Sequence, residues 1–183
     1  MEDLEEVLKS LKSNQSRDAN DLVNELFQIE NIGNDLKESI LLLCNQIKTE
    51  IHLPSSLRDA FISSIPKNQK NPLQLENQRG IFLVNKVKNI LMKLIYNSTI
   101  AEIEENLTES NIGSRKERSP RDHVFVINSI INETVKDKSK EPVDFVFYDV
   151  RQCFDSLWVE KTIMDLSKNG VNNDMLNLIH ETT

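Results

Sequence analysis

Cysteine and glycine are scarce in this sequence, and proline is little more frequent. The 183 residues include 2 Cys, 4 Gly and 5 Pro. Cys44 and Cys153 lie far apart, lack a CxxC spacing and stand among apolar residues, so a disulfide framework or a thiolate metal site is not expected. The cysteine pattern instead indicates an intracellular compartment. The composition, 38% hydrophobic and 28% charged, favours a helix-rich globular chain.

Long apolar runs and common binding motifs are also missing. The first residues, MEDLEEVLKSLK, are acidic and amphipathic, and no stretch approaches the ~18 apolar residues that span a bilayer. We therefore expect neither a leader nor a membrane anchor. The three histidines are isolated from one another, and GxxxxGK[ST] and GxGxxG do not occur, so zinc chemistry and the usual nucleotide-binding loops are not predicted.

Charge is distributed unevenly along the chain. Residues 1–60 carry 6 basic and 12 acidic side chains, residues 61–140 carry 13 and 9, and residues 141–183 carry 3 and 8. The formal net charge of -7 argues against a wholly basic nucleic-acid-binding protein. The basic middle region could still bind an anion, although random variation of surface charge is the alternative.

Apolar residues at helical spacing predict several helices. Two stripes lie in the first fifty residues: Leu4, Val7, Leu8 and Leu11, then Leu36, Ile40, Leu43, Cys44, Ile47 and Ile51. A short helix at 21–27 is expected between them. Two further stripes are Val84, Val87, Leu91, Leu94 and Ile95, and Val124, Ile127, Ile131 and Val135. Ser119 and Pro120 precede the last stripe as N-cap and first helical residue.

Two segments favour strands. Residues 60–67 form an apolar run that ends at a proline and precedes a polar loop, which suggests a hairpin-like element. Residues 143–150, VDFVFYDV, are aromatic and β-branched, as expected of a buried central strand with Asp149 near its end. Two short helices should follow at 158–169 and 172–182, separated by Gly170 as a C-cap.

Asp149 is the strongest candidate for chemistry from position alone. A carboxylate at the end of a buried strand is a common Mg²⁺ ligand, but two-metal catalysis needs several converging carboxylates. Asp149 and Asp155 form only part of such a set. The alternative is that both residues cap the next helix or form a surface pair.

The wider pattern around Asp149 is more specific. The stretch FYDVRQCFD resembles motif A of the reverse transcriptases of non-LTR retrotransposons, F-x-D-x-x-x-A-F-D, with Cys153 in place of the usual alanine. The resemblance implies that Asp149 binds metal. It also implies that Phe154 is the aromatic residue that excludes a ribose 2′-hydroxyl, although an ordinary core Phe is the alternative.

Further motifs follow the family's order upstream of motif A. Ile65, Pro66 and Lys67 resemble its I-P-K segment, and Asn77, Arg79 and Ile81 resemble N-x-R-x-I. The resemblance implies that Lys67 and Arg79 contact the triphosphate of the incoming deoxynucleotide, although solvated loop charge is the alternative.

The segment NIGSRKERSPRD resembles Q-x-G-F-R-x-x-R-S-x-x-D, but Asn111 and Ser114 differ from the usual glutamine and phenylalanine. Its basic residues could line a template path, or they could be solvated loop charges. They are Arg115, Lys116, Arg118 and Arg121.

The resemblance implies an α+β fold that comprises a helical N-terminal region (1–59), fingers (60–140) and the first half of a palm (141–183). The full enzyme would use two Mg²⁺ ions, deoxynucleoside triphosphates, an RNA template and a DNA primer. The family's Ala-Asp-Asp turn is absent, since no Asp-Asp dipeptide occurs. We therefore expect an N-terminal fragment that is inactive alone and self-associates through exposed palm surface.

Two alternatives stay open. The chain could be a non-catalytic relic that binds RNA or a protein, or an unrelated helical interaction protein. A strand at 143–149 paired with residues 60–66 would favour the polymerase, and an all-helical fold would favour the unrelated protein.

Overall fold

The computed structural model describes residues 1–18, 20–29, 34–67, 71, 73–136, 141–150, 153 and 156–183. These residues form helices and one two-stranded sheet, which agrees with the predicted mixture of α and β structure. The chain divides into two compact units. Unit 1 comprises Met1–Ile103 and Val159–Thr183, and unit 2 comprises Glu104–Trp158.

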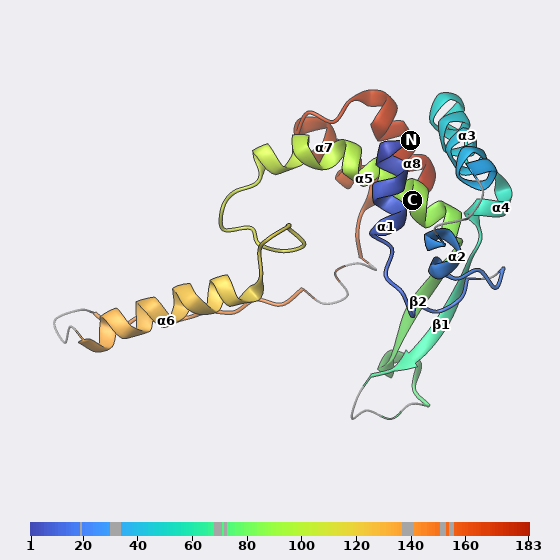
Figure 1. Cartoon of the computed structure of the whole chain (residues 1–183). Helices are drawn as coiled ribbons and strands as arrows, with labels where there is room; N and C mark the ends of the chain where they lie inside the picture. The colour runs from blue at the N-terminus through green and yellow to red at the C-terminus, as the bar shows by residue number, and fades with distance from the viewer. Residues whose placement is uncertain are drawn as a thin grey trace. The chain divides into compact units, whose positions relative to one another are not determined.

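Unit 1 contains most of the helices (Figure 1). They are α1 (Glu2–Lys9), α2 (Asn24–Gln28), α3 (Asn34–Glu50), α4 (Ser55–Arg58), α7 (Val159–Lys168), α8 (Asn173–Thr182) and most of α5 (Lys86–Asn106). The predicted stripes agree with α1, α3 and α5, except that Leu11 and Ile51 lie just beyond the ends of α1 and α3 and that Val84 ends a strand. The predicted helix at 21–27 begins only at Asn24, after Asp21 with a φ of 60°.

The hydrophobic core of unit 1 unites elements from both ends of the chain. The buried apolar residues are Leu4, Val7, Leu8, Leu11, Phe27, Ile40, Cys44, Ile47, Leu53, Leu57, Ile90, Leu91, Ile95, Val171, Met175, Leu176 and Leu178. α8 therefore packs into one cluster with the N-terminal helices. Burial of this area supplies most of the stability of the unit.

A β-hairpin extends from the helices of unit 1. Strands β1 (Ala60–Pro66) and β2 (Gln78–Val84) pair antiparallel, with Ala60 opposite Val84 and Pro66 opposite Gln78. A 3₁₀ turn, η1 (Leu75–Asn77), leads into β2. The predicted strand at 60–67 is confirmed to Pro66, and its partner is 78–84 rather than 143–149.

Unit 2 contains a loop, the helix α6 (Pro120–Lys136) and the segment 141–150. α6 confirms the predicted helix, but it has no buried residue. The predicted buried strand at 143–150 is wrong, because these residues carry no strand pairing and are all exposed. A strand needs a neighbour for its backbone N–H and C=O groups, and none among the described residues pairs with this segment.

Candidate functional site

Lys67 and Arg79 come together at the turn end of the hairpin. Arg79 lies opposite Ile65 in the register, and the Lys67 N–H donates to the Asn77 carbonyl at 2.7 Å, one step beyond the last paired residues. Side chains alternate along a strand, so Lys67, Ile65 and Arg79 share one face. Two cations twelve positions apart in sequence thus become diagonal neighbours.

The side chains of Lys67 and Arg79 differ in their surroundings. Lys67 Nζ donates to the backbone carbonyl of Glu76 at 2.8 Å, which holds the ammonium over the turn. Arg79 is exposed. An exposed guanidinium beside a tethered ammonium can bind a polyanion such as a triphosphate, because both donate charge-assisted hydrogen bonds.

The Asn77 side chain forms hydrogen bonds within the turn of the hairpin. Its Nδ2 donates to the Asn71 carbonyl at 3.1 Å and to Gln74 Oε1 at 2.9 Å. The Leu73 N–H donates to Asn71 Oδ1 at 3.0 Å. In this N-x-R motif the asparagine therefore fixes the turn that precedes Arg79.

Gly80 follows Arg79 for a packing reason. A Cβ built at Gly80 would lie 3.3 Å from Cγ2 of Ile62, tighter than most real contacts. The absent side chain lets Ile62 cover the paired strand. Apolar side chains on both faces of the hairpin remain exposed, namely Phe61, Ile62, Ile65, Ile81 and Phe82.

Arg115 does not face solvent as predicted for a template contact. Its Nε donates to Glu104 Oε1 at 2.8 Å, and its Nη1 donates to the carbonyls of Thr108 and Asn111, both at 2.9 Å. The side chain is only 10% exposed. Arg115 therefore closes the loop from the end of α5, since one guanidinium satisfies three acceptors.

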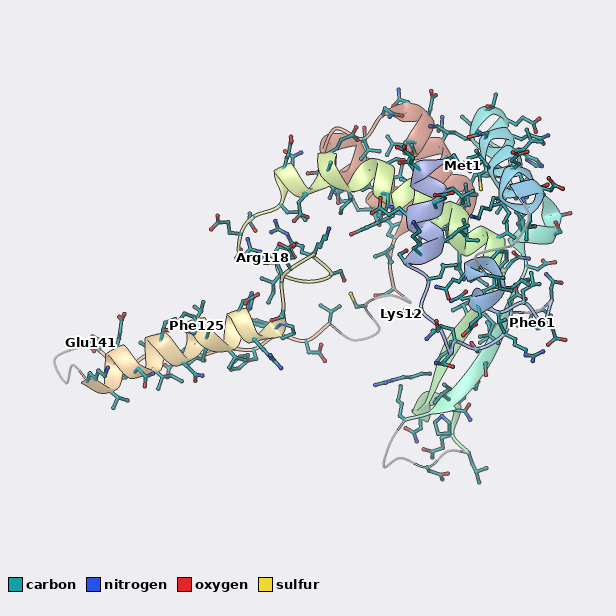
Figure 2. All side chains as sticks on the ribbon, in the orientation of Figure 1. Met1, Lys12, Phe61, Arg118, Phe125 and Glu141 are labelled. Atoms are coloured by element: carbon teal, nitrogen blue, oxygen red, sulfur yellow. The ribbon has the colours of Figure 1, made fainter. Side chains whose placement is uncertain are left out.

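The other three basic residues of this segment, Lys116, Arg118 and Arg121, are exposed. Figure 2 shows Arg118 on the loop that precedes α6. Ser114 and Glu117 adopt left-handed backbone angles, with φ of 58° and 61°, and turn the chain around Lys116. The loop thus presents Lys116 and Arg118 to solvent, and the first turn of α6 adds Arg121.

The start of α6 is held by two local contacts. The Ser119 N–H donates to Asp122 Oδ2 at 2.8 Å, which is one half of a capping box. The His123 Nε2 lies 3.0 Å from the Ser110 carbonyl. The Ser119-Pro120 start of the helix, predicted from sequence, is confirmed.

Asp149 lies in the exposed segment 141–150 of unit 2, which has no regular secondary structure. Phe147 and Tyr148 beside it are 77% and 92% exposed. Asp144, five residues before Asp149, is exposed as well. Phe154 and Asp155, predicted as the sugar filter and a companion carboxylate, lie outside the described residues.

Within the described parts of the chain, no three His, Cys, Asp or Glu side chains gather where they could hold a metal ion. Asp149 thus supplies one carboxylate and does not by itself fit a two-metal centre. Of the described helices, none is both long and apolar enough to cross a membrane.

Cys44 belongs to the core and has no chemical role that the structure supports. It is 4% exposed, and burial raises the pKa of its thiol to about 11. The thiolate is therefore strongly disfavoured at neutral pH, and only the thiolate is a good nucleophile.

One connection was not predicted from the sequence. Asp18 is 7% exposed, and its Oδ2 accepts a hydrogen bond from the Lys86 N–H at 2.8 Å. The only sequence signal was the polar run Ser16-Arg17-Asp18 before a helix. Neither charge nor spacing indicates a partner 68 positions away.

A scan against models of known protein families found no match to this chain. The family resemblance therefore rests on the motifs themselves and on their order along the sequence.

Proposed function

We propose that this chain is the N-terminal part of an RNA-directed DNA polymerase of the non-LTR retrotransposon type, which contributes nucleotide- and template-binding elements. The observation that carries the proposal is the hairpin register, because it brings Lys67 and Arg79 to one end and one face. Two residues that bind one triphosphate must lie close together. The twelve positions between Lys67 and Arg79 in the sequence do not by themselves guarantee this proximity.

In this proposal Lys67 and Arg79 bind the triphosphate of the incoming deoxynucleotide. Arg79 offers a planar pair of donors to phosphate oxygens, and Lys67 adds a point charge. Asp149 would be one carboxylate ligand of Mg²⁺, which offsets phosphate charge when bound. The described residues do not complete a metal centre, so no bond-making step is assigned to this chain alone.

The proposed nucleotide site can be tested by fusing the chain to the C-terminal half of a related reverse transcriptase. Lys67→Ala and Arg79→Ala should each raise the KM for deoxynucleotides with little change in kcat, because a phosphate contact persists from ground state to transition state. Lys9→Ala and Arg17→Ala remove exposed cations elsewhere in unit 1 and serve as matched controls. A fall in kcat alone, or no change, would contradict the assignment.

Phe154 is proposed as the sugar filter in the same fusion. A bulky ring beside the ribose excludes a 2′-hydroxyl by overlap, and a smaller side chain would admit it. Phe154→Val should therefore raise incorporation of ribonucleotides relative to deoxyribonucleotides. Unchanged discrimination in an active fusion would show that Phe154 has another role.

A second candidate is a non-catalytic relic that binds RNA. Three exposed cations favour this candidate: Lys116 and Arg118 on the loop that Arg115 closes, and Arg121 in the first turn of α6. The isolated chain should then bind single-stranded RNA with an affinity that falls as salt rises. Replacement of all three cations by alanine should weaken binding and flatten the salt dependence, whereas Lys9, Lys12 and Arg17 replaced together should not.

A further inference from the structure

We propose that Asp18 is a positioning residue that fixes the direction in which the β1–β2 hairpin leaves the helices of unit 1. The importance of the hairpin for nucleotide binding rests on the proposed function, but the positioning itself does not.

The Asp18 carboxylate is fully used by backbone donors. Oδ1 accepts from the N–H groups of Asn20 and Leu22, both at 2.9 Å, and Oδ2 accepts from the Lys86 N–H at 2.8 Å. The Asp18 N–H donates to the Leu22 carbonyl at 3.1 Å. One oxygen thus folds the loop between α1 and α2, and the other ties that loop to the first residue of α5.

The Lys86 side chain donates a second hydrogen bond to the loop that carries Asp18. Its Nζ donates to the Ser16 carbonyl at 2.8 Å, and the residue is only 7% exposed. Asn85 Oδ1 accepts from the Val87 N–H at 2.8 Å. Two of the backbone amides that every helix start leaves without a helical partner are therefore bound, one by Asn85 and one by Asp18.

This connection lies at the joint between β2 and α5. β2 ends at Val84 and α5 begins at Lys86, so the backbone at Asn85 sets the direction of the hairpin. Every residue of β1 is exposed, and in β2 only Gln78, Leu83 and Val84 are half-buried, so little packing holds the hairpin in place. Hydrogen bonds at the joint then add to the restraint that Leu83 and Val84 supply.

The loop that carries Asp18 is itself anchored to the core. Asn24 Nδ2 donates to the Lys12 carbonyl at 2.8 Å, and Gln28 Nε2 donates to the Leu11 carbonyl at 2.6 Å. Leu11 is buried. The restraint on Lys86 is therefore transmitted from the α1 core and not from a free loop.

Asp18→Asn should keep the hydrogen bonds within the loop and remove the one to Lys86. The amide oxygen can still accept from Asn20 and Leu22, but the amide nitrogen is a donor and faces the Lys86 N–H. Lys86→Met breaks the Ser16 contact from the other side and is a second variant. Asp21→Asn makes the same chemical change at an exposed residue of the same loop and is the control.

The test measures the distance between spin labels at Leu75→Cys and Leu42→Cys in the full chain carrying Cys153→Ser. Both labelled positions are exposed, at 83% and 70%, and both lie in unit 1. Asp18→Asn should broaden the distance distribution, and Asp21→Asn should leave it narrow. Exchange of the Lys86 amide should rise by on the order of ten- to a hundredfold, while amides in α3 and α8 stay protected.

Two outcomes would overturn the proposal. One is an unchanged distribution in both Asp18→Asn and Lys86→Met. The other is faster exchange throughout α3 and α8, which would mean that Asp18 supports general stability only. In the polymerase fusion, Asp18→Asn should raise the KM for deoxynucleotides and leave kcat unchanged. A broadened distribution with an unchanged KM would retain the positioning role and reject the nucleotide site on the hairpin.

Discussion

Arg115 illustrates how a single charged residue can be misjudged from its neighbours. Sequence placed it in a basic cluster, and the structure uses it to close a loop through Glu104, Thr108 and Asn111. Arginine suits both roles, since its five donors can satisfy phosphate or protein oxygens equally well. Only the position of the acceptors decides between them.

Arg115→Ala should loosen this loop more than Lys116→Ala. The alanine variant removes the guanidinium hydrogen bonds to the Glu104 carboxylate and to the carbonyls of Thr108 and Asn111, and hydrogen bonds to a charged group typically contribute about 1.5–3 kcal/mol. Amide exchange at residues 107–119 should therefore accelerate in Arg115→Ala and not in Lys116→Ala. Equal exchange in the two variants would show that the internal contacts of Arg115 are unimportant.

Glu181 should make the stability of unit 1 sensitive to acid. The pKa of this carboxyl is lowered from its ordinary 4.5 because the Leu53 N–H donates to it, with Arg58, His52 and His180 adding favourable charge. A lowered pKa gives a contribution that is present above about pH 4.5 and is lost as the pH falls through the folded value.

Glu181→Gln should therefore destabilise the chain at neutral pH. The gap, which is the difference in free energy of unfolding between wild type and variant, should shrink below pH 4.5. Urea unfolding at several pH values measures this gap. Glu38→Gln, at an exposed residue of α3, is the control and should give a small gap throughout. A gap for Glu181→Gln that widens in acid would reverse the assigned sign.

At the scale of elements, the sequence predicted that Gly170 separates α7 from α8 as a C-cap, and the structure adds the hydrogen bonds around it. Gly170 has a φ of 92°, its N–H donates to the Ser167 carbonyl, and the Val171 N–H donates to the Leu166 carbonyl. This is a Schellman motif. Asn172 then caps α8, because its side chain accepts from the Met175 N–H at 2.9 Å.

Gly170→Ala should lower stability by about 1–2 kcal/mol, the usual cost of a left-handed backbone for a residue with a Cβ. Nothing lies within 4 Å of the added atom, so the cost comes from the backbone alone. Gly113→Ala is a suitable comparison, since its Cβ would meet Asn111 Oδ1 at an ordinary 3.8 Å. Thermal unfolding should show a clear decrease for Gly170→Ala only.

The two predicted strands had different outcomes for one physical reason. Residues 60–66 pair with 78–84, which follow after the connection 67–77, and the entropy lost on closing such a loop rises only slowly with its length. Residues 143–150 have equally strong strand composition but no pairing partner among the described residues. Strand propensity describes a fit to a sheet that other segments must supply.

At the scale of the whole molecule, unit 1 has a core and unit 2 exposes its apolar residues. Val124, Phe125 and Val135 of α6 are 55%, 73% and 72% exposed, and Val146 and Phe147 are 69% and 77% exposed. Exposed apolar side chains in such number favour association. This feature supports the expectation of self-association, which concentration-dependent sedimentation can measure.

The isolated chain should not extend a primer. Asp149 can supply only part of the ligand set that two Mg²⁺ ions need, and the 183 residues contain no Asp-Asp dipeptide. The chain should be incubated with primed RNA, deoxynucleotides and Mg²⁺ or Mn²⁺. Extension that disappears in Asp149→Asn would reveal a metal site that neither sequence nor fold indicates.

The sequence by itself determined the local elements: the stripes of α1, α3, α5 and α6, the Ser119-Pro120 start and the Gly170 turn. These features depend on periodicity and on backbone preferences within a few residues. The tertiary structure alone decided that Asp18 binds Lys86, that Arg115 faces inward and that 143–150 lacks a partner. Each of these outcomes depends on contacts between residues that lie apart in the sequence, and local conformational preferences do not determine such contacts.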